Sequence, residues 1–465
     1  MTPDGAPEPS DDLARIVTEP PGPLSRRLAA QLRDVESRNV TYLGSGGPIF
    51  LASGQGATLS DVDGNRYVDL CGAFGVAAAG HANPAVSAAL ADASRTLLHG
   101  MGDVYPTQAK VLLAQQLCAL TPGDGSKRVI FATSGAEAVE AALKTAAIAT
   151  GKAGVLCFGG AYHGLTYGAL AVSDRDHFRK PFLRQLGSFA TRVPYADPRT
   201  CSASEACPPC DCSCLDTVRS ALEEPAGQDI GALIVEPAQG RGGELFPPDD
   251  WLRGLRTICD DRGLLLIADE IYTGFGRTGR WFACEHAGIV PDLICVGKGL
   301  SSGFPISACV GSAEVMDRWP ESTGEAIHTS TFLGSPAGCA AALASIGQIC
   351  EHRLVERADS LGRPLGEMLH QLRARRLESV GDVRGRGLMW GVECVDSAGA
   401  PSGEIAARAL RRALKLGVIA LAGGPQANVI SISPPLCISL NQIAFAVGVL
   451  DEALSEPPLN ARACR

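Results

Sequence analysis

The feature that most constrains the fold is a series of short apolar runs that alternate with helical patterns between about residues 85 and 335. Five of these runs are expected to be strands, at residues 129–132, 154–158, 232–235, 264–268 and 293–296. Strands that are apolar almost throughout must be covered on both faces, which is typical of a mostly parallel sheet between two layers of helices. The pattern therefore predicts an α/β fold.

The same patterns divide the chain into four parts. Residues 1–23 are rich in proline, and we expect them to form a mobile tail. Residues 24–84 hold a predicted helix and a predicted hairpin, and this N-terminal segment is expected to join the small domain. Residues 85–340 are predicted to form a large domain around the mostly parallel sheet, and residues 341–465 a smaller α+β domain.

Composition excludes several classes of protein. The chain has 465 residues, of which 46% are hydrophobic and 20% charged, so it can bury a large core. The net charge of −9 and the lack of a basic block argue against nucleic acid or an anionic membrane as a partner. No apolar run approaches the roughly 18 residues that a membrane-spanning helix needs. The start lacks a secretory signal, and the 17 cysteines indicate reduced thiols, so we expect a cytoplasmic protein.

Polar residues follow each of the five predicted strands. In chain order these segments are Ser134-Gly135-Ala136, Tyr162-His163-Gly164, Glu236-Pro237, Asp269-Glu270 and Gly297-Lys298-Gly299. In open α/β sheets, ligands bind beyond the carboxyl ends of the strands. The five segments therefore predict one binding site at one edge of the sheet.

Three of these segments suit the parts of a single ligand. Ser134 is a good N-cap for the helix that follows it, and Gly135 allows close approach of a phosphate to the free N–H groups. Asp269 follows an apolar strand and needs a cationic partner, such as a protonated pyridine nitrogen. Lys298 can serve as an amine nucleophile if it is partly desolvated. Together these groups match pyridoxal 5′-phosphate, although each alone also fits a capped helix, a structural ion pair or a surface turn.

The order of these motifs resembles that of the class III aminotransferases, the ornithine and 4-aminobutyrate aminotransferase group, over about residues 45–455. The matching motifs are Ser134-Gly135-Ala136-Glu137-Ala138, Tyr162-His163-Gly164, Glu236-Pro237-Ala238-Gln239-Gly240, the run from Asp269 to Gly279, Gly297-Lys298-Gly299 and the run from Ile432 to Leu436. The resemblance implies the transferase fold type I that binds pyridoxal phosphate. It also implies amino transfer from a small amine or amino acid to an oxo acid, by a homodimer with its sites at the interface.

The resemblance also implies roles for individual residues. Lys298 would form the Schiff base with the cofactor and move the proton between the substrate Cα and the cofactor C4′. Asp269 would keep the pyridine nitrogen protonated. By the same resemblance, Gly135 and Ala136 would bind the cofactor phosphate, with Ser134 capping the helix. Tyr162 and Ile271 would lie against the two faces of the ring, and Gln239 would lie near the ring hydroxyl. Thr331 would reach the cofactor phosphate of the partner subunit.

Two positions depart from the family's pattern. Members that use 2-oxoglutarate often carry two arginines for its carboxylates, and this chain has Leu165 and Ser431 in their places. Because a bidentate arginine supplies much of the recognition of a carboxylate, we expect 2-oxoglutarate to be a poor acceptor. Glu236, which often pairs with the second arginine, could instead receive an amine of the substrate. The alternative is that another arginine, Arg384 or Arg386, serves the site.

Other functions stay open at this point. An amino-acid racemase or epimerase on the same fold would need the same Lys298 and Asp269 but would return the proton to Cα. A cofactor-free scaffold or a cysteine-based metal-binding module is a non-enzyme alternative. The segment Cys201–Cys214 contains Cys207-x-x-Cys210, which has metal-ligand spacing, but a reduced thiol-rich loop explains it as well. We therefore predict no metal site.

Overall fold

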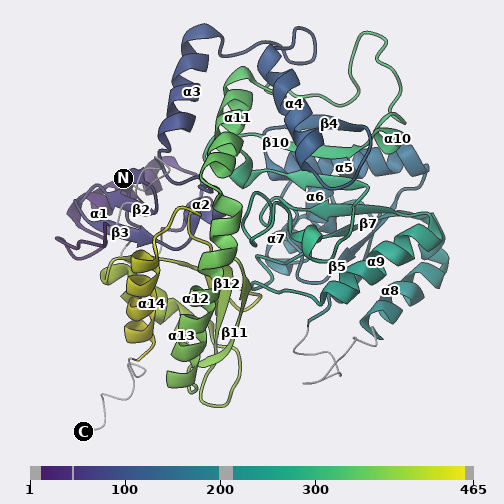
Figure 1. The fold of residues 1–465 in the computed structure, drawn as a ribbon. Helices are drawn as coiled ribbons and strands as arrows, with labels where there is room; N and C mark the ends of the chain where they lie inside the picture. The colour runs from purple at the N-terminus through teal and green to yellow at the C-terminus, as the bar shows by residue number, and fades with distance from the viewer. Residues whose placement is uncertain (1–11, 44–46, 198–212, 456–465) are drawn as a thin grey trace.

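The structure is a computed structural model, shown in Figure 1, that describes residues 12–43, 47–197 and 213–455. Its centre is a seven-stranded sheet with the order β4-β10-β9-β8-β7-β5-β6. These strands are β4 (Lys127–Ala132), β10 (Ser307–Ser312), β9 (Leu293–Val296), β8 (Leu265–Asp269), β7 (Ile230–Val235), β5 (Gly154–Phe158) and β6 (Ala190–Val193). The pairs from β9 to β6 are all parallel, and β10 is antiparallel to both of its neighbours. The predicted α/β fold with a mostly parallel sheet is confirmed.

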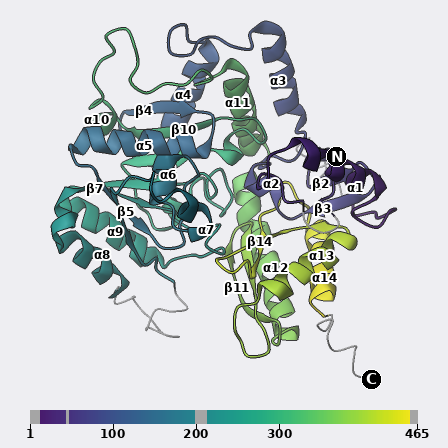
Figure 2. The same cartoon turned by 180° about the vertical axis from the view of Figure 1, so that it is seen from behind.

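Alternate residues of the central strands belong to two hydrophobic clusters, as a period of two requires. In β5, for example, Val155 and Cys157 belong to one cluster and Leu156 belongs to the other. Helices cover both faces of the sheet (Figure 1 and Figure 2). One cluster includes α5 (Gly135–Thr150), α6 (Tyr167–Val172) and α10 (Ala313–Met316). The other includes α4 (Gln108–Leu120), α8 (Ser213–Glu223), α9 (Asp249–Arg262) and α11 (Pro336–Glu351).

Two smaller sheets complete the fold. The first has the order β1-β2-β3-β13, with β1 (Leu51–Gln55), β2 (Thr58–Asp61), β3 (Arg66–Asp69) and β13 (Val418–Ile419). The second has the order β11-β12-β15-β14, with β11 (Val380–Arg386), β12 (Met389–Cys394), β15 (Val429–Ile432) and β14 (Leu421–Gly423). Helices α12 (Leu354–Arg375) and α13 (Gly403–Lys415) pack on this second sheet, and α14 (Leu440–Leu454) packs on them.

The parallel pairing of β13 with β3 joins the N-terminal hairpin to the C-terminal part of the chain. At the turn of that hairpin, Gly64 has a φ of 87°, which an L side chain adopts only with strain. Helix α11 runs through residue 340, where the sequence places a domain boundary, and the chain turns at Arg353 (φ 49°) before α12 begins. The exact division into domains stays a prediction.

The segment before α1 (Pro23–Val35) is bonded to the hairpin, although the sequence predicts a mobile tail there. Arg15 and Arg66 exchange main-chain hydrogen bonds of 2.9 Å, and the buried side chain of Asn65 accepts a 2.9 Å bond from the N–H of Val17. Residues 1–11 lie outside the described residues, as does nearly all of the Cys201–Cys214 segment. In the described part of the chain, no helix is long and apolar enough to cross a bilayer.

Candidate active site

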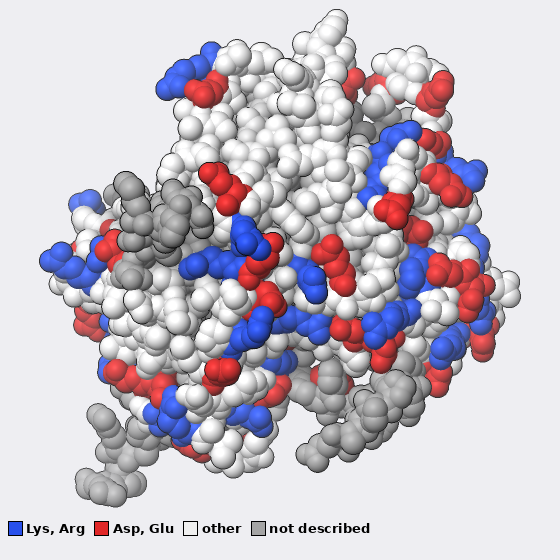
Figure 3. Space-filling model, in the orientation of Figure 1, with Lys and Arg blue, Asp and Glu red and all other residues white. Residues whose placement is uncertain are grey.

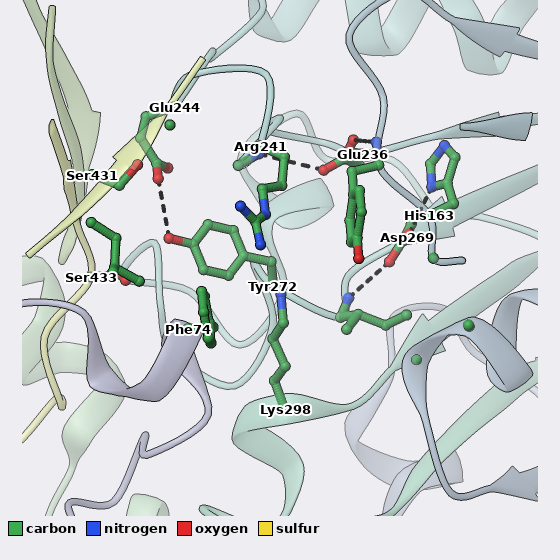
Figure 4. Close-up of a pocket in the computed structure, with 18 of the residues that line it drawn as sticks. Phe74, His163, Glu236, Arg241, Glu244, Asp269, Tyr272, Lys298, Ser431 and Ser433 are labelled. Carbon is green, nitrogen blue, oxygen red and sulfur yellow. Dashed lines mark hydrogen bonds and ion pairs between the residues drawn. The ribbon is translucent and has the colours of Figure 1, made fainter. Parts of the chain in front are cut away.

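A pocket of about 370 Å³ opens at the carboxyl ends of β5, β7, β8 and β9 (Figure 4). Residues of β14 and β15 form its opposite wall, so the pocket lies between the central sheet and the second small sheet. Its lining includes most of the site residues predicted from the sequence, namely Ser134, Gly135, Ala136, Tyr162, Leu165, Glu236, Asp269, Ile271, Lys298 and Ser431. A pocket of this volume is typical of a site for a small ligand.

The start of α5 forms one end of the pocket. Ser134 is the N-cap, and its hydroxyl accepts a hydrogen bond from the N–H of Glu137, whose carboxylate bonds back to the N–H of Ser134. The N–H groups of Gly135 and Ala136 belong to the first turn and have no carbonyl partner within the helix. A Cβ at position 135 would lie 2.8 Å from the side chain of Ile271, so only glycine leaves room here. The helix start is therefore suited to an anion.

Asp269 lies at the end of β8 and is held by two contacts. One carboxylate oxygen lies 2.7 Å from Nδ1 of His163, and the other accepts a 3.1 Å bond from the N–H of Ile271. Burial by itself would lower the pKa of His163, but the hydrogen bond and charge of Asp269 outweigh burial and raise that pKa above its usual value. The contact between His163 and Asp269 therefore fixes the position of the carboxylate at the end of β8.

Lys298 follows β9 in a strained turn with a φ of 42°, between two glycines. Residues in this region of backbone space are found where the surrounding structure imposes them, often at functional sites. The Lys298 ammonium lies 4.4 Å from the centroid of the Tyr272 ring. Burial lowers the pKa of Lys298 to about 8, although the charges of Asp269 and Glu236 oppose the shift. At pH 7 roughly a tenth of Lys298 is therefore in its neutral, nucleophilic form, far more than for an ordinary lysine.

Glu236 lies at the end of β7 and is almost fully buried. Its carboxylate accepts hydrogen bonds from the N–H of Tyr162 at 2.9 Å and the N–H of Gly240 at 3.4 Å. Burial raises the pKa of Glu236 to about 7, so this carboxyl group can gain or lose a proton near neutral pH. No arginine forms part of these contacts.

The two arginines considered as replacements for the missing pair are bound elsewhere. The guanidinium of Arg384 bonds to Glu393 at 2.6 Å, and that of Arg386 bonds to Asp249 at 3.1 Å. Neither residue lines the pocket. The alternative that Arg384 or Arg386 serves the site is therefore not supported by their positions.

Arg241 is a pocket cation that sequence reasoning missed. Its guanidinium carbon lies 5.5 Å from the ring centroid of Phe74 and 5.5 Å from that of Tyr162, and the side chain extends into the pocket in Figure 4. The position of Arg241, directly after the Glu236–Gly240 motif, is the signal that could have indicated it. Other lining residues not predicted to have a role are Phe74, His163, Glu244, Tyr272 and Ser433.

Two predicted site residues do not line the pocket. Gln239 is fully buried, and its Nε2 donates a 2.9 Å hydrogen bond to the carbonyl of Gly159, while its Oε1 has no hydrogen-bond partner. Thr331 is exposed on the surface, in the chain segment between β10 and α11. The structure therefore brings ten of the twelve predicted positions into the lining, and Gln239 and Thr331 remain outside it.

Comparison with known proteins identifies the family. Residues 43–454 match the model of the family described as aminotransferase class-III. The chain belongs to the class III aminotransferases. This aminotransferase is 37% identical over 449 residues to the 4-aminobutyrate aminotransferase of Mycobacterium leprae, covering 95% of this chain and 98% of that one. It is 36% identical over 443 residues to the 5-aminovalerate aminotransferase of Pseudomonas aeruginosa, covering 93% of this chain and 98% of that one.

The aminotransferase is also similar to solved structures. A thermostable (S)-enantioselective omega-transaminase from Thermomicrobium roseum has a TM-score of 0.86 and 27% identity, with 92% of this chain and 98% of that one covered. The family predicted from the motifs is confirmed, together with fold type I, the cofactor pyridoxal 5′-phosphate and amino transfer from an amine or amino acid to an oxo acid. Nothing in these relatives favours a racemase.

Proposed function

We propose that pyridoxal 5′-phosphate binds in this pocket, with its phosphate at the first turn of α5, its ring nitrogen at Asp269 and its aldehyde at Lys298. The proposal is carried by one observation, which is that an anion site, a fixed carboxylate and an amine of lowered pKa line the same cavity. The absence of a Cβ at Gly135, where one would meet Ile271, fits a ligand held close to the backbone.

When bound, the cofactor supplies an electron-withdrawing ring that stabilises negative charge on the substrate carbon that has lost its proton. Asp269, paired with His163, contributes a fixed negative charge at the end of β8. Lys298 Nζ, with a pKa of about 8, is the group suited to take up the substrate proton and to return it. Tyr162 and Ile271 form the walls against which a flat ring would lie.

The two positions outside the lining keep their proposed roles. Gln239 is proposed to lie near the ring hydroxyl, and the lack of a hydrogen-bond partner for its buried Oε1 in the described structure supports that role. Thr331 is proposed to reach the cofactor phosphate of a second copy of the chain, which agrees with its exposure on the surface.

We also propose that the enzyme is a cytoplasmic homodimer. Exposed apolar side chains gather in two neighbouring segments, 97–105 and 327–332, which are joined by a 2.9 Å hydrogen bond from Thr329 to Asp103. Among them, Phe332 is 59% exposed and contacts His99. Figure 3 shows few charged side chains over α4 and α11, next to these segments. An apolar surface of this kind is typical of a permanent interface.

We infer that the acceptor is a monocarboxylate oxo acid whose carboxylate binds Arg241. Apart from Lys298, Arg241 is the one lysine or arginine in the described lining of the pocket, whereas a dicarboxylate needs a cation at each end. The aromatic rings of Phe74 and Tyr162 flank the guanidinium without using its N–H donors. The guanidinium lines the pocket and extends into it in Figure 4, where a substrate carboxylate could bind.

The acceptor preference can be measured directly. We expect pyruvate to have a higher kcat/KM than 2-oxoglutarate, and Arg241→Met to lower the value for pyruvate roughly ten- to a hundredfold, because one charged hydrogen-bonding pair is lost. Arg280→Met, which changes an exposed arginine, is the matched control and should leave kcat/KM unchanged. A wild-type preference for 2-oxoglutarate of roughly tenfold or more would contradict the inference.

A further inference from the structure

Glu244 is a buried carboxylate in the lining of the pocket. It is 1% exposed, and one carboxylate oxygen accepts a 3.1 Å hydrogen bond from the hydroxyl of Tyr272. The other oxygen, Oε2, is buried and has no hydrogen-bond partner. Burial raises the pKa of Glu244 to about 8, although Ser431, Tyr272 and the charges of Arg384 and Arg277 oppose the shift. A buried carboxylate oxygen without a hydrogen-bond partner is costly and calls for a ligand or a function.

The charges of Arg384 and Arg277 favour the ionised form of Glu244, but in the described structure neither guanidinium donates a hydrogen bond to its carboxylate. Arg384 donates to the main-chain carbonyl of Glu244 at 3.1 Å, and its guanidinium is otherwise bound to Asp382 and Glu393. Nη1 of Arg277 donates to the main-chain carbonyls of Leu388 and Pro434, and its Nη2 is buried without a hydrogen-bond partner in the described structure. Ser431 stands where the family often has an arginine, so no arginine at that position pairs with the carboxylate.

Tyr272 lies between Glu244 and Lys298 and contacts both. The ring of Tyr272 has the Lys298 ammonium over its face at 4.4 Å, and its hydroxyl bonds to Glu244. Figure 4 shows Tyr272 between these two residues, with Ser431 beside Glu244. A substrate that reacts beside Lys298 can therefore extend past the Tyr272 ring toward Glu244.

We propose that Glu244, the Tyr272 hydroxyl and Ser431 form a subsite that binds a second, non-reacting ammonium group of the amino donor. The donor is accordingly a diamine or a diamino acid, and this inference rests on the function proposed for the pocket. An ammonium group supplies both the positive charge and the N–H donors that Oε2 and the Ser431 hydroxyl can accept. In its ionised form the same carboxylate repels the distal carboxylate of a dicarboxylate, which adds to the exclusion of 2-oxoglutarate.

The subsite can be tested with matched pairs of amines. The probes are putrescine and cadaverine, compared with butylamine and pentylamine, which have the same chains but lack the second amine. With pyruvate as acceptor, we expect wild-type kcat/KM to be at least roughly tenfold higher for each diamine, and Glu244→Gln to lower the diamine values roughly ten- to a hundredfold. The values for the monoamines should stay the same or rise, because the amide keeps the shape and removes only the charge.

Glu367→Gln, on the exposed side of α12, is the matched control and should change neither class of amine. Cofactor absorbance and melting temperature of the Glu244→Gln enzyme show whether it folds and binds the cofactor. Equal wild-type values for diamines and monoamines, or an equal loss for both in Glu244→Gln, would overturn the subsite. If the wild type converts no amine, alanine included, the function proposed for the pocket itself fails and the subsite falls with it.

Discussion

Replacement of Lys298 by alanine is expected to remove covalent attachment of the cofactor and to lower turnover by several factors of ten. The described lining of the pocket contains no other lysine, so no second amine can take over the attachment or the proton transfer. Each factor of ten corresponds to about 1.4 kcal/mol of transition-state stabilisation. The measurement is the initial rate of amino transfer, together with the absorbance of the purified enzyme.

Lys180→Ala serves as the control, because Lys180 is an exposed lysine outside the pocket. This variant should keep both its rate and its bound cofactor. The assignment of Lys298 would be refuted if Lys298→Ala, after treatment with borohydride, still carried the cofactor in a form that denaturation does not release.

The second large effect is expected for Asp269→Asn, which should retain some cofactor but lose several factors of ten in turnover. An amide has almost the same shape as the carboxylate but no negative charge, so it cannot favour the protonated ring nitrogen. The substitution also removes the charge that raises the pKa of His163. Titration of the enzyme with the cofactor separates the loss of binding from the loss of rate.

Asp92→Asn, which changes an exposed aspartate of α3 (Pro84–Thr96), controls for the loss of one negative charge and should leave the rate unchanged. Near-normal turnover of Asp269→Asn, with the cofactor absorbance undisturbed, would count against Asp269 as the partner of the ring nitrogen.

The buried strands were the most predictable part of the fold. The runs at 154–158 and 293–296 coincide with β5 and β9, because apolar residues bounded by turn residues leave little choice of structure. Strand β10 was missed. Its sequence, SACVGS, mixes small and polar residues, and only its pairing with β4 and β9 makes it a strand. Tertiary context of this kind is not visible in a local pattern.

The site was predictable where it depends on strand ends. Asp269 and Lys298 line the same pocket because each follows a strand of the parallel sheet, and the carboxyl ends of parallel strands lie at one edge. This much follows from sequence order alone. Arg241 and Glu244 were missed because they lie in the loop after β7, whose path depends on tertiary contacts. In that loop Gln239 and Leu245 exchange main-chain hydrogen bonds, and Glu244 adopts a φ of 54°. The pairing of His163 with Asp269 likewise depends on how β5 and β8 are placed.

Amino transfer by this site is tested most directly by a half-reaction without an acceptor. Alanine, the amino acid that corresponds to pyruvate, is added in excess to the holoenzyme, and the pyruvate released is counted per site. We expect one equivalent of pyruvate, a matching change in cofactor absorbance, its reversal when fresh pyruvate is added, and no pyruvate from Lys298→Ala. Formation of the opposite enantiomer of alanine, with no pyruvate and no lasting change in absorbance, would instead show a racemase and contradict the proposed function.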